Sequence, residues 1–247
     1  MNTDQATHWR HFTGDPNTAE ACEYRRRRLA AAHRPPIFSR AAYLRELARG
    51  RRVLNVGAAD HYGGSRSIEK WLHQEICATA AYCLGVDVLA EEVRKLQQQG
   101  HNVRLCDITR EVVGERFDVI VCKVIEHLGN PGALFEAAQR HLLPGGRLVV
   151  KAPNPYALWR IKHNLRGEVW DSVDHVALHW PPGITELAER QGMRLDRYFG
   201  VAELARTWKS RALIRCLPVL AAMGLAREAV CETIVYECVR ADENTVP

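Results

Sequence analysis

The chain has 247 residues, a formal net charge of +5 and a hydrophobic fraction of 47%. These values exclude a disordered chain and favour a single α/β domain with extensions, large enough to bury a substantial core. No N-terminal apolar stretch resembles a signal peptide, and no run approaches the roughly 20 apolar residues of a membrane-spanning helix. We therefore expect a cytoplasmic protein with no membrane span.

The positions of the eight cysteines are those expected in a reducing cytoplasm. They include no C-x-x-C pair, and several of them lie within apolar runs. A free cysteine in such surroundings behaves as a small apolar side chain. We expect reduced and mainly buried thiols, with neither a disulfide nor a zinc site.

Two helices are expected before the first strand. The pattern predicts one helix around residues 19–32, which a Pro-Pro pair at 35–36 follows, and a second helix over 39–48. Residues 1–38 are interpreted as a helical N-terminal extension that can contribute to a cap. The four consecutive arginines at 25–28 favour a solvated helix face over a nucleic-acid site.

Five apolar segments then alternate with helical patterns. The strands are predicted over 53–56, 82–86, 103–106, 117–122 and 148–150. The helix after the first strand is expected to include Ile68, Trp71 and Ile76, and the helix after the fourth to begin at Asn130-Pro131. Such alternation predicts an α/β fold with a Rossmann-like, doubly wound parallel sheet and helices on both faces.

The pattern is looser beyond residue 153. Residues 154–182, rich in tryptophan and histidine, are interpreted as a cap-like insertion in a domain that spans 39–247. The remaining elements are predicted as a helix over 184–191, a strand over 193–199, a helix near 210–225 and a strand over 233–239.

The first strand leads directly into a turn of small residues, Gly57-Ala58-Ala59-Asp60. Such a turn lets a ligand approach the backbone, and an acid at the end of the next strand, Asp87, can accept hydrogen bonds from both hydroxyls of a ribose. The turn lacks the G-x-G-x-x-G spacing, and no G-K-[ST] follows it, which argues against a bound pyrophosphate. The sequence therefore predicts a nucleoside cofactor without phosphates.

Several motifs resemble those of class I S-adenosylmethionine-dependent methyltransferases over residues 39–240. They are Val-Leu-Asn-Val-Gly-Ala-Ala-Asp (53–60), Gly-Val-Asp (85–87), Phe-Asp-Val-Ile-Val-Cys (117–122) with Val-Ile-Glu-His-Leu (124–128), Leu-Leu-Pro-Gly-Gly-Arg-Leu-Val-Val (142–150) and Ala-Pro-Asn-Pro-Tyr (152–156). The chain is most similar to the bacterial small-molecule branch that includes the ubiquinone-biosynthesis O-methyltransferases. This resemblance implies a seven-stranded sheet, mostly parallel, with an antiparallel C-terminal strand.

The resemblance also implies a site for S-adenosyl-L-methionine. The residues implied to bind it are Gly57, Ala58, Ala59, Asp60, Asp87, Val88, Asp107, Ile108 and Lys123. The turn would pack against the methionine part, Asp87 would hold the ribose, and Val88 and Asp107 would contact the adenine. The backbone at Lys123 would reach the sulfonium side.

Three positions depart from the usual family pattern. The family usually has an acid where Asn55 stands, and glycines where Ala59 and His61 stand. These departures leave open a degenerate methyltransferase fold that serves as a binding or scaffold protein. The turn also disfavours an NAD-dependent oxidoreductase.

Methyl transfer is an in-line displacement, so the protein mainly positions the reactants and excludes water. For a hydroxyl acceptor, a nearby base adds about 10²–10⁴-fold. The candidate catalytic residues are His127 and His179, although His127 could instead only orient its loop. With Glu126 and His175 they could also hold a metal ion. We predict none, because Lys123 stands where a related RNA methyltransferase group has its first glutamate ligand.

The resemblance thus implies methyl transfer to a small-molecule acceptor, with a hydroxyl oxygen as the favoured atom. The alternative acceptors are RNA and protein, towards which the arginine run at 25–28 would steer a polyanion. The sequence offers no basic surface interleaved with aromatic residues, so we expect no nucleic-acid partner. The acceptor itself is not encoded in the cofactor motifs, because the variable cap recognises it.

Overall fold

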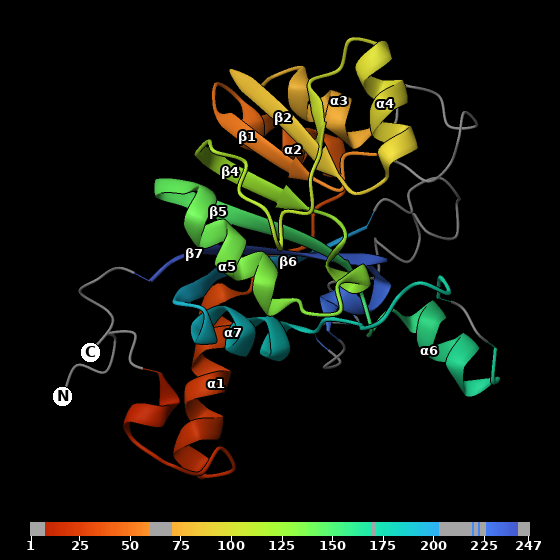
Figure 1. The fold of residues 1–247 in the computed structure, drawn as a ribbon. Coiled ribbons are helices and arrows are strands. Elements are labelled where there is room, and N and C mark those ends of the chain that lie inside the picture. Colours follow the sequence, from red (N-terminus) through yellow and green to blue (C-terminus); the bar gives the residue numbers. More distant parts are fainter. Residues whose placement is uncertain are drawn as a thin grey trace.

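The computed structural model describes residues 8–59, 71–168, 171–202, 219, 222 and 226–241. Within these residues, seven strands form one sheet in the order β3-β2-β1-β4-β5-β7-β6 (Figure 1). The strands are β1 (Arg52–Val56), β2 (Tyr82–Asp87), β3 (Val103–Leu105), β4 (Phe117–Cys122), β5 (Leu142–Pro153), β6 (Met193–Val201) and β7 (Thr233–Arg240). The pairs are parallel except that β7 runs antiparallel to β5 and β6. The predicted Rossmann-like sheet is therefore confirmed.

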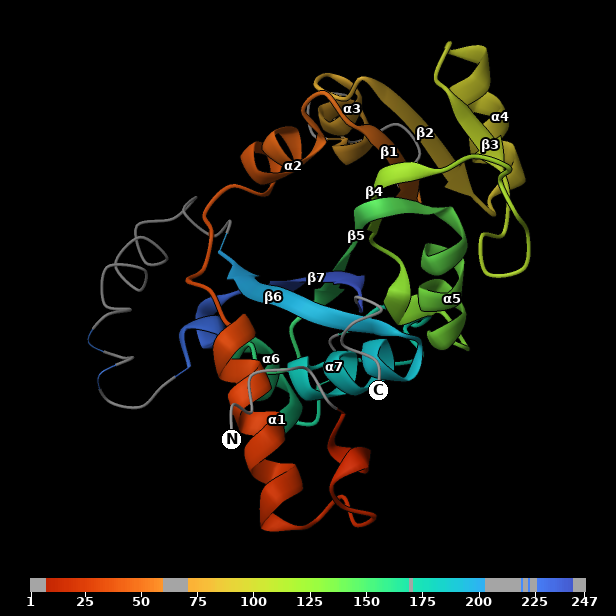
Figure 2. The same ribbon diagram turned by 90° about the vertical axis from the view of Figure 1, so that its left-hand side faces the viewer.

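Helices cover both faces of this sheet, and Figure 2 views the same arrangement from the side. They are α1 (Ala19–Ala32), α2 (Arg40–Ala48), α3 (Leu72–Cys77), α4 (Ala90–Gln98), α5 (Gly132–His141), α6 (Leu158–Leu165) and α7 (Pro181–Arg190). Neighbouring strand residues point to opposite faces. Val121 of β4 therefore packs with α2 and α3, whereas Cys122 belongs to the cluster that contains residues of α5 and α7.

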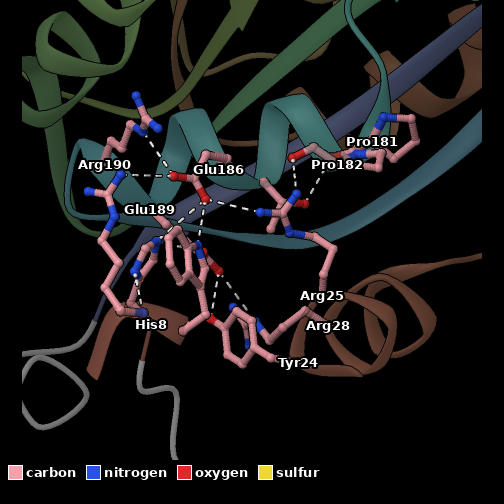
Figure 3. Close-up of polar contacts among 12 residues, drawn as sticks. His8, Tyr24, Arg25, Arg28, Pro181, Pro182, Glu186, Glu189 and Arg190 are labelled. Carbon is pink, nitrogen blue, oxygen red and sulfur yellow. Dashed lines mark hydrogen bonds and ion pairs between the residues drawn. The ribbon is translucent and has the colours of Figure 1, made fainter. Parts of the chain in front are cut away.

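The N-terminal extension docks on α7 through two buried or half-buried carboxylates (Figure 3). Glu186 accepts a hydrogen bond from the Trp9 indole at 3.0 Å and pairs with Arg25 at 3.1 Å. Glu189 accepts a hydrogen bond from the Tyr24 hydroxyl at 2.9 Å. Because these contacts join residues far apart in the sequence, they hold α1 and η1 (Trp9–His11) against the sheet domain.

The other arginines of the run at 25–28 have acidic partners as well. Arg26 and Arg27 both pair with Glu23 one turn earlier on α1, and Arg28 lies 3.6 Å from a Glu189 oxygen. Each arginine therefore balances a carboxylate of this protein.

Helix α7 begins at Pro181, three residues before its predicted start, and three other elements differ from the prediction as follows. Strand β5 begins at Leu142, directly after α5, and not at residue 148; a register shift between Phe117 and Val119 of β4 accommodates the added residues. Helix α5 begins at Gly132, whose N–H donates to the Asn130 side chain at 3.1 Å. The shift is one residue, within the usual uncertainty of a helix end.

The third correction concerns the helix after β1. Helix α3 starts at Leu72, and Trp71 precedes it at the N-cap position in an extended conformation; its indole N–H donates to the Ala58 carbonyl at 2.8 Å. Ile68 and most of the helix predicted near 210–225 lie outside the described residues. The division into a 1–38 extension and a 39–247 domain with a cap-like insertion at 154–182 stays a prediction.

Among the described helices, none combines the length and the apolar character that crossing a membrane requires. The described cysteines are free thiols. Cys22 and Cys77 are exposed, which departs from the expectation of buried thiols, whereas the thiols of the central strands are buried.

Candidate cofactor and acceptor site

The strand order reverses between β1 and β4, which lie side by side in the centre of the sheet. The chain passes from β1 to β2 on one side and from β4 to β5 on the other. In open parallel sheets, ligands bind beyond the carboxyl ends of the strands at such a point. The residues that follow β1 and β4 are therefore the first place to look for a site.

Gly57 ends β1 in a conformation that a side chain would disturb. Its φ is +78°, in the left-handed region, and a Cβ at this position would lie 2.4 Å from Cγ1 of Val124. Glycine is therefore required both for the turn and for the close approach of β1 to the loop after β4. Ala58 and Ala59 follow it as buried residues, and Asp60 lies outside the described residues.

Asp87 connects this turn to the end of β2. Its Oδ2 accepts the Ala59 N–H at 2.9 Å, and its Oδ1 accepts the Leu89 N–H at 3.1 Å. A carboxylate offers about four acceptor sites, so each oxygen retains capacity beyond these two bonds. The side chain is thus fixed in place by the backbone while it can still accept from a ligand.

The cofactor contacts predicted after Asp87, which are Val88, Asp107 and Ile108, differ in exposure. Val88 is 62% exposed, beside Asp87, whereas Ile108 is 4% exposed and belongs to the core. The Asp107 carboxylate accepts from the backbone and hydroxyl of Thr109 and lies 3.5 Å from Arg110. Asp107 therefore stabilises its own loop, and the Ile108 side chain faces away from the surface of a ligand site.

A pocket lies beside the turn, between α2, α3 and the sheet, with about 370 Å³ of unfilled space, open solvent included. Asn55 and Lys123 contribute to its wall together with apolar residues such as Leu72 and Val235. Lys123 also lies close to Gly57, since its Cγ would be 3.5 Å from a Cβ there. The side chain of Lys123 thus belongs to the junction of β1 and β4.

Polar side chains gather over the loop after β4, where η3 (Ile125–His127) forms one short turn. The Glu126 carbonyl accepts the Val176 N–H at 2.9 Å, so the segment at 171–180 lies against η3. Nδ1 of His127 lies 3.0 Å from a carboxylate oxygen of Asp174. The rings of His127 and His175 meet edge to face, with their centroids 4.9 Å apart.

A second histidine–carboxylate pair lies next to the first. Nδ1 of His175 is 3.3 Å from Asp171, and Asp171 also binds the buried guanidinium of Arg160. Arg160 is 3% exposed, so this ion pair is buried and fixes the position of the segment at 171–180. Both histidines are thus oriented by an acid on the segment that covers η3.

Burial sets the protonation states around this cluster. It lowers the pKa of His175 and of His179, and it raises the pKa of Glu126. The lowered pKa favours the neutral form of His175 and His179, which is the form that can accept a proton. Nε2 of His179 and Oε2 of Glu126 are buried without a hydrogen-bond partner among the described residues.

The sequence paired His127 with His179, whereas the structure brings His127 together with His175 and Glu126. Ligand atoms of these three residues lie within 4.8 Å of one another, so they could hold a divalent cation. The His179 side chain lies apart, towards the backbone of Ile125, and the Tyr236 hydroxyl donates to its carbonyl at 3.0 Å. The prediction of a metal-free active site stays a prediction.

Sequence reasoning missed two contributions. The indole of Trp71, bonded to the Ala58 carbonyl, holds the turn from the start of α3. Asp174 orients His127 from 47 residues further along the chain. The Asp171–Asp174–His175–His179 pattern gave a signal for the second contribution, but nothing in the sequence indicated which acid meets which histidine.

Comparison with known proteins agrees with this geometry. Residues 22–210 match a family described as "Methyltransferase domain". No curated protein matches the chain. Solved structures with a similar fold include an S-adenosylmethionine-dependent methyltransferase from Mesorhizobium loti, with a TM-score of 0.52 and 16% identity over 81% of this chain and 96% of the other.

Two further structures are similar at the level of the fold. The CcbJ methyltransferase from Streptomyces caelestis has a TM-score of 0.53 and 16% identity over 81% of this chain and 93% of its own. The magnesium protoporphyrin IX methyltransferase from Synechocystis PCC 6803, with bound S-adenosylhomocysteine, has a TM-score of 0.50 and 16% identity over 94% and 93%.

The chain belongs to the methyltransferase domain family, because the match covers more than half of its length. It is an S-adenosylmethionine-dependent methyltransferase with the Rossmann-like fold of that class. The predicted class, enzyme type and cofactor are thereby confirmed.

Proposed function

We propose that this methyltransferase transfers the methyl group of S-adenosyl-L-methionine to a hydroxyl oxygen of a small-molecule acceptor. The observation that carries the proposal is the His127–Asp174 pair at 3.0 Å, on the loop that touches the Gly57 turn. A histidine oriented by an acid next to a cofactor turn is an arrangement suited to general base catalysis.

The residues of the turn fit the cofactor. Gly57 gives the turn its positive φ and brings it against the loop after β4, Asp87 keeps acceptor capacity for two ribose hydroxyls, and Val88 offers an exposed apolar surface for the adenine. Asp60 and Asp107 complete the proposed set, together with Ala58, Ala59, Lys123 and the backbone of Ile108. When bound, the cofactor supplies an electrophilic methyl group on a sulfonium whose leaving group is a neutral thioether.

His127 is proposed as the base. With its Nδ1–H donating to Asp174, the Nε2 lone pair of His127 is available to the acceptor hydroxyl; this tautomer follows from the hydrogen-bond network. Nε2 would take up the proton that the acceptor hydroxyl loses during methyl transfer. Asp174 then stabilises the imidazolium that forms.

The neighbouring imidazoles support the same chemistry by remaining uncharged. Burial disfavours protonation of His175 and His179. Since a sulfonium is a cation, neutral rings close to the methyl group avoid an unfavourable like-charge interaction. His179 remains the second proposed catalytic residue; its buried Nε2 has no hydrogen-bond partner among the described residues.

An acceptor with an apolar portion fits the covering segment best. Val176, Leu178 and Trp180 are 63%, 37% and 50% exposed on the segment that also carries Asp174 and His175. Exposed apolar side chains next to convergent polar groups are typical of small-molecule sites. A nucleic-acid acceptor has less support, since the four arginines at 25–28 are paired with Glu23, Glu186 and Glu189.

The test is an acceptor panel with methyl-labelled cofactor. Phenols, catechols, hydroxy acids, amines, thiols, total RNA and denatured protein are incubated separately with the enzyme, and S-adenosylhomocysteine and the labelled product are measured by mass spectrometry. Label on the oxygen of a hydroxylated small molecule, absent with the His127→Gln variant, supports the proposal. Label only on RNA, on protein or on nitrogen overturns it.

Cytoplasmic location and membership of the ubiquinone-biosynthesis branch remain predictions from the sequence.

A further inference from the structure

A second cluster of reactive side chains lies between α3 and the sheet, apart from the histidines at η3. His73 of α3 is 1% exposed, Cys77 follows it one turn later on the same helix, and Cys83 lies near the start of β2. Nε2 of His73 is 3.4 Å from the Cys77 sulfur, and Nδ1 is 3.8 Å from the Cys83 sulfur. Neither the proposed base nor the proposed cofactor contacts use any of the three.

We propose that His73, Cys77 and Cys83 form a binding site for a thiophilic d¹⁰ cation, with Zn²⁺ as the occupant. One ligand atom from each residue lies within 4.8 Å of the others. With Zn–S and Zn–N bonds of about 2.3 and 2.0 Å, adjacent ligands of a tetrahedral site lie roughly 3.4–3.8 Å apart. The Cys77 sulfur, 3.4 Å from Nε2, already has this spacing, and the Cys83 sulfur, which lies 3.8 Å from Nδ1, would reach the ion by rotation of its side chain.

The donor set selects the class of cation. Two thiolates and an imidazole contain no oxygen, and Mg²⁺ and Ca²⁺ prefer oxygen ligands. The Glu126–His127–His175 cluster at the active site offers no sulfur, so the two clusters would bind different ions or respond to different probes. The exposed Cys77 gives the ion a path to His73 and leaves a fourth position for water.

The imidazole is already held in place by its surroundings. A Cβ on Gly85 would lie 2.8 Å from Cε1 of His73, and the Trp71 ring centroid lies 4.9 Å from that of His73. The amide nitrogen Nδ2 of the buried Asn55 lies 3.1 Å from Nδ1 of His73. With the amide flipped, its oxygen would accept the Nδ1–H and leave Nε2 for the metal, as partners of metal-bound histidines commonly do.

This arrangement accounts for Asn55, where the family usually has an acid. The ion would join α3 to β2, and through Asn55 to β1, directly before the Gly57 turn. Ligands that bind only the folded state stabilise it. We therefore expect Zn²⁺ to raise the melting temperature of the reduced protein. The sequence did not predict this site, because its spacing is His-x₃-Cys-x₅-Cys with no Cys-x-x-Cys pair.

The test uses the full-length protein, reduced and stripped of metal, under anaerobic conditions. Co²⁺ serves as the probe, because a thiolate ligand to cobalt gives an intense charge-transfer absorption that a carboxylate or imidazole ligand does not. We expect one Co²⁺ per chain with this absorption, its displacement by Zn²⁺, and its loss in both Cys77→Ser and Cys83→Ser.

Two controls separate the site from other metal binding. The Cys22→Ser variant changes an exposed thiol on α1, and His127→Gln changes the other cluster; both should retain the charge-transfer band. Cys77 is exposed, so its variant is expected to fold, which circular dichroism confirms. Absence of the band from the wild type, or its persistence in Cys77→Ser, overturns the proposal.

Discussion

The cofactor half and the acceptor half of the candidate site are built from different kinds of contact. Around the Gly57 turn the backbone dominates: the turn needs a positive φ, and Asp87 is fixed by two backbone N–H groups. Over η3 the contacts join side chains, with His127 and His175 each held by an acid on an exposed segment. The first half is compact and local in the sequence, whereas the second depends on a segment that follows β5.

This difference indicates which half is general and which is particular to the protein. A backbone turn and one acid suffice for a cofactor that every member of the class uses. Side chains on a surface segment can change without disturbing the sheet, so such a segment can determine which acceptor the enzyme binds. Four variants and one binding measurement test this difference between the two halves.

The largest expected effect is on turnover in the acceptor half. His127→Gln removes the proposed base, so kcat should fall about 10²–10⁴-fold while KM for S-adenosylmethionine stays unchanged. The measurement is steady-state S-adenosylhomocysteine formation with the acceptor found in the panel. His163→Gln, which changes another histidine–carboxylate pair on α6, is the matched control and should leave kcat unchanged. An equal loss in both variants would show that His127 has no special role.

The second prediction concerns the stability of the cofactor half. Gly57→Ala places a Cβ 2.4 Å from Val124 in a residue with φ of +78°, so the strain and the overpacking should add to about 2–4 kcal/mol. Gly114 has φ of +81° with no atom within 4 Å of a Cβ, so Gly114→Ala isolates the strain alone, about 1–2 kcal/mol. Urea denaturation measures both. Equal losses would mean that the close contact to Val124 costs nothing.

A smaller effect on turnover is expected from the acid that orients the base. Asp174 is half exposed, so water screens its interaction with His127, and Asp174→Asn should lower kcat about tenfold. Glu168→Gln, the equivalent change in the His163 pair, should have no effect on kcat. If Asp174→Asn keeps full activity, Asp174 does not set the orientation of His127.

The smallest expected effect is the pH dependence of stability. Burial lowers the pKa of His179 below its ordinary value of 6.5, so the unfolded state binds its proton more readily. The contribution of neutral His179 is fully present above pH 6.5 and is lost as the pH falls through the lowered pKa. His179→Gln should therefore flatten the acid side of the stability curve, measured between about pH 5 and pH 8. A variant with the wild-type slope would contradict the burial of this ring.

The same contrast explains what the sequence could predict. Strand β4 and helix α1 have the predicted bounds, and most other strands agree to one or two residues, because apolar periodicity and capping are local signals. β5 was predicted too short, since Pro144, Gly145 and Gly146 are usual helix stops; in the structure Leu142 pairs with Phe117, pairing resumes at Arg147 with Val119, and the three residues lie in the irregularity between these two pairs. Tertiary pairing overrode the local signal.

The candidate site divides in the same way. Gly57 and Asp87 were predictable, because a small-residue turn and a strand-end acid have meaning at fixed places in a parallel sheet. The pairing of His127 with Asp174, and of His73 with Asn55 and two cysteines, was not. Those contacts form only when segments from different strands meet, and no spacing in the sequence encodes the distance between them.

We assign cofactor binding to the first half of the site and the reaction to the second. Calorimetry with S-adenosylhomocysteine on Asp87→Asn and His127→Gln separates these two roles. Asp87→Asn should weaken binding at least about tenfold, since it removes a charge-assisted acceptor for the ribose, whereas His127→Gln should keep the wild-type Kd. If His127→Gln weakens binding as much as Asp87→Asn, or if Asp87→Asn binds like the wild type, this assignment of the two halves is contradicted.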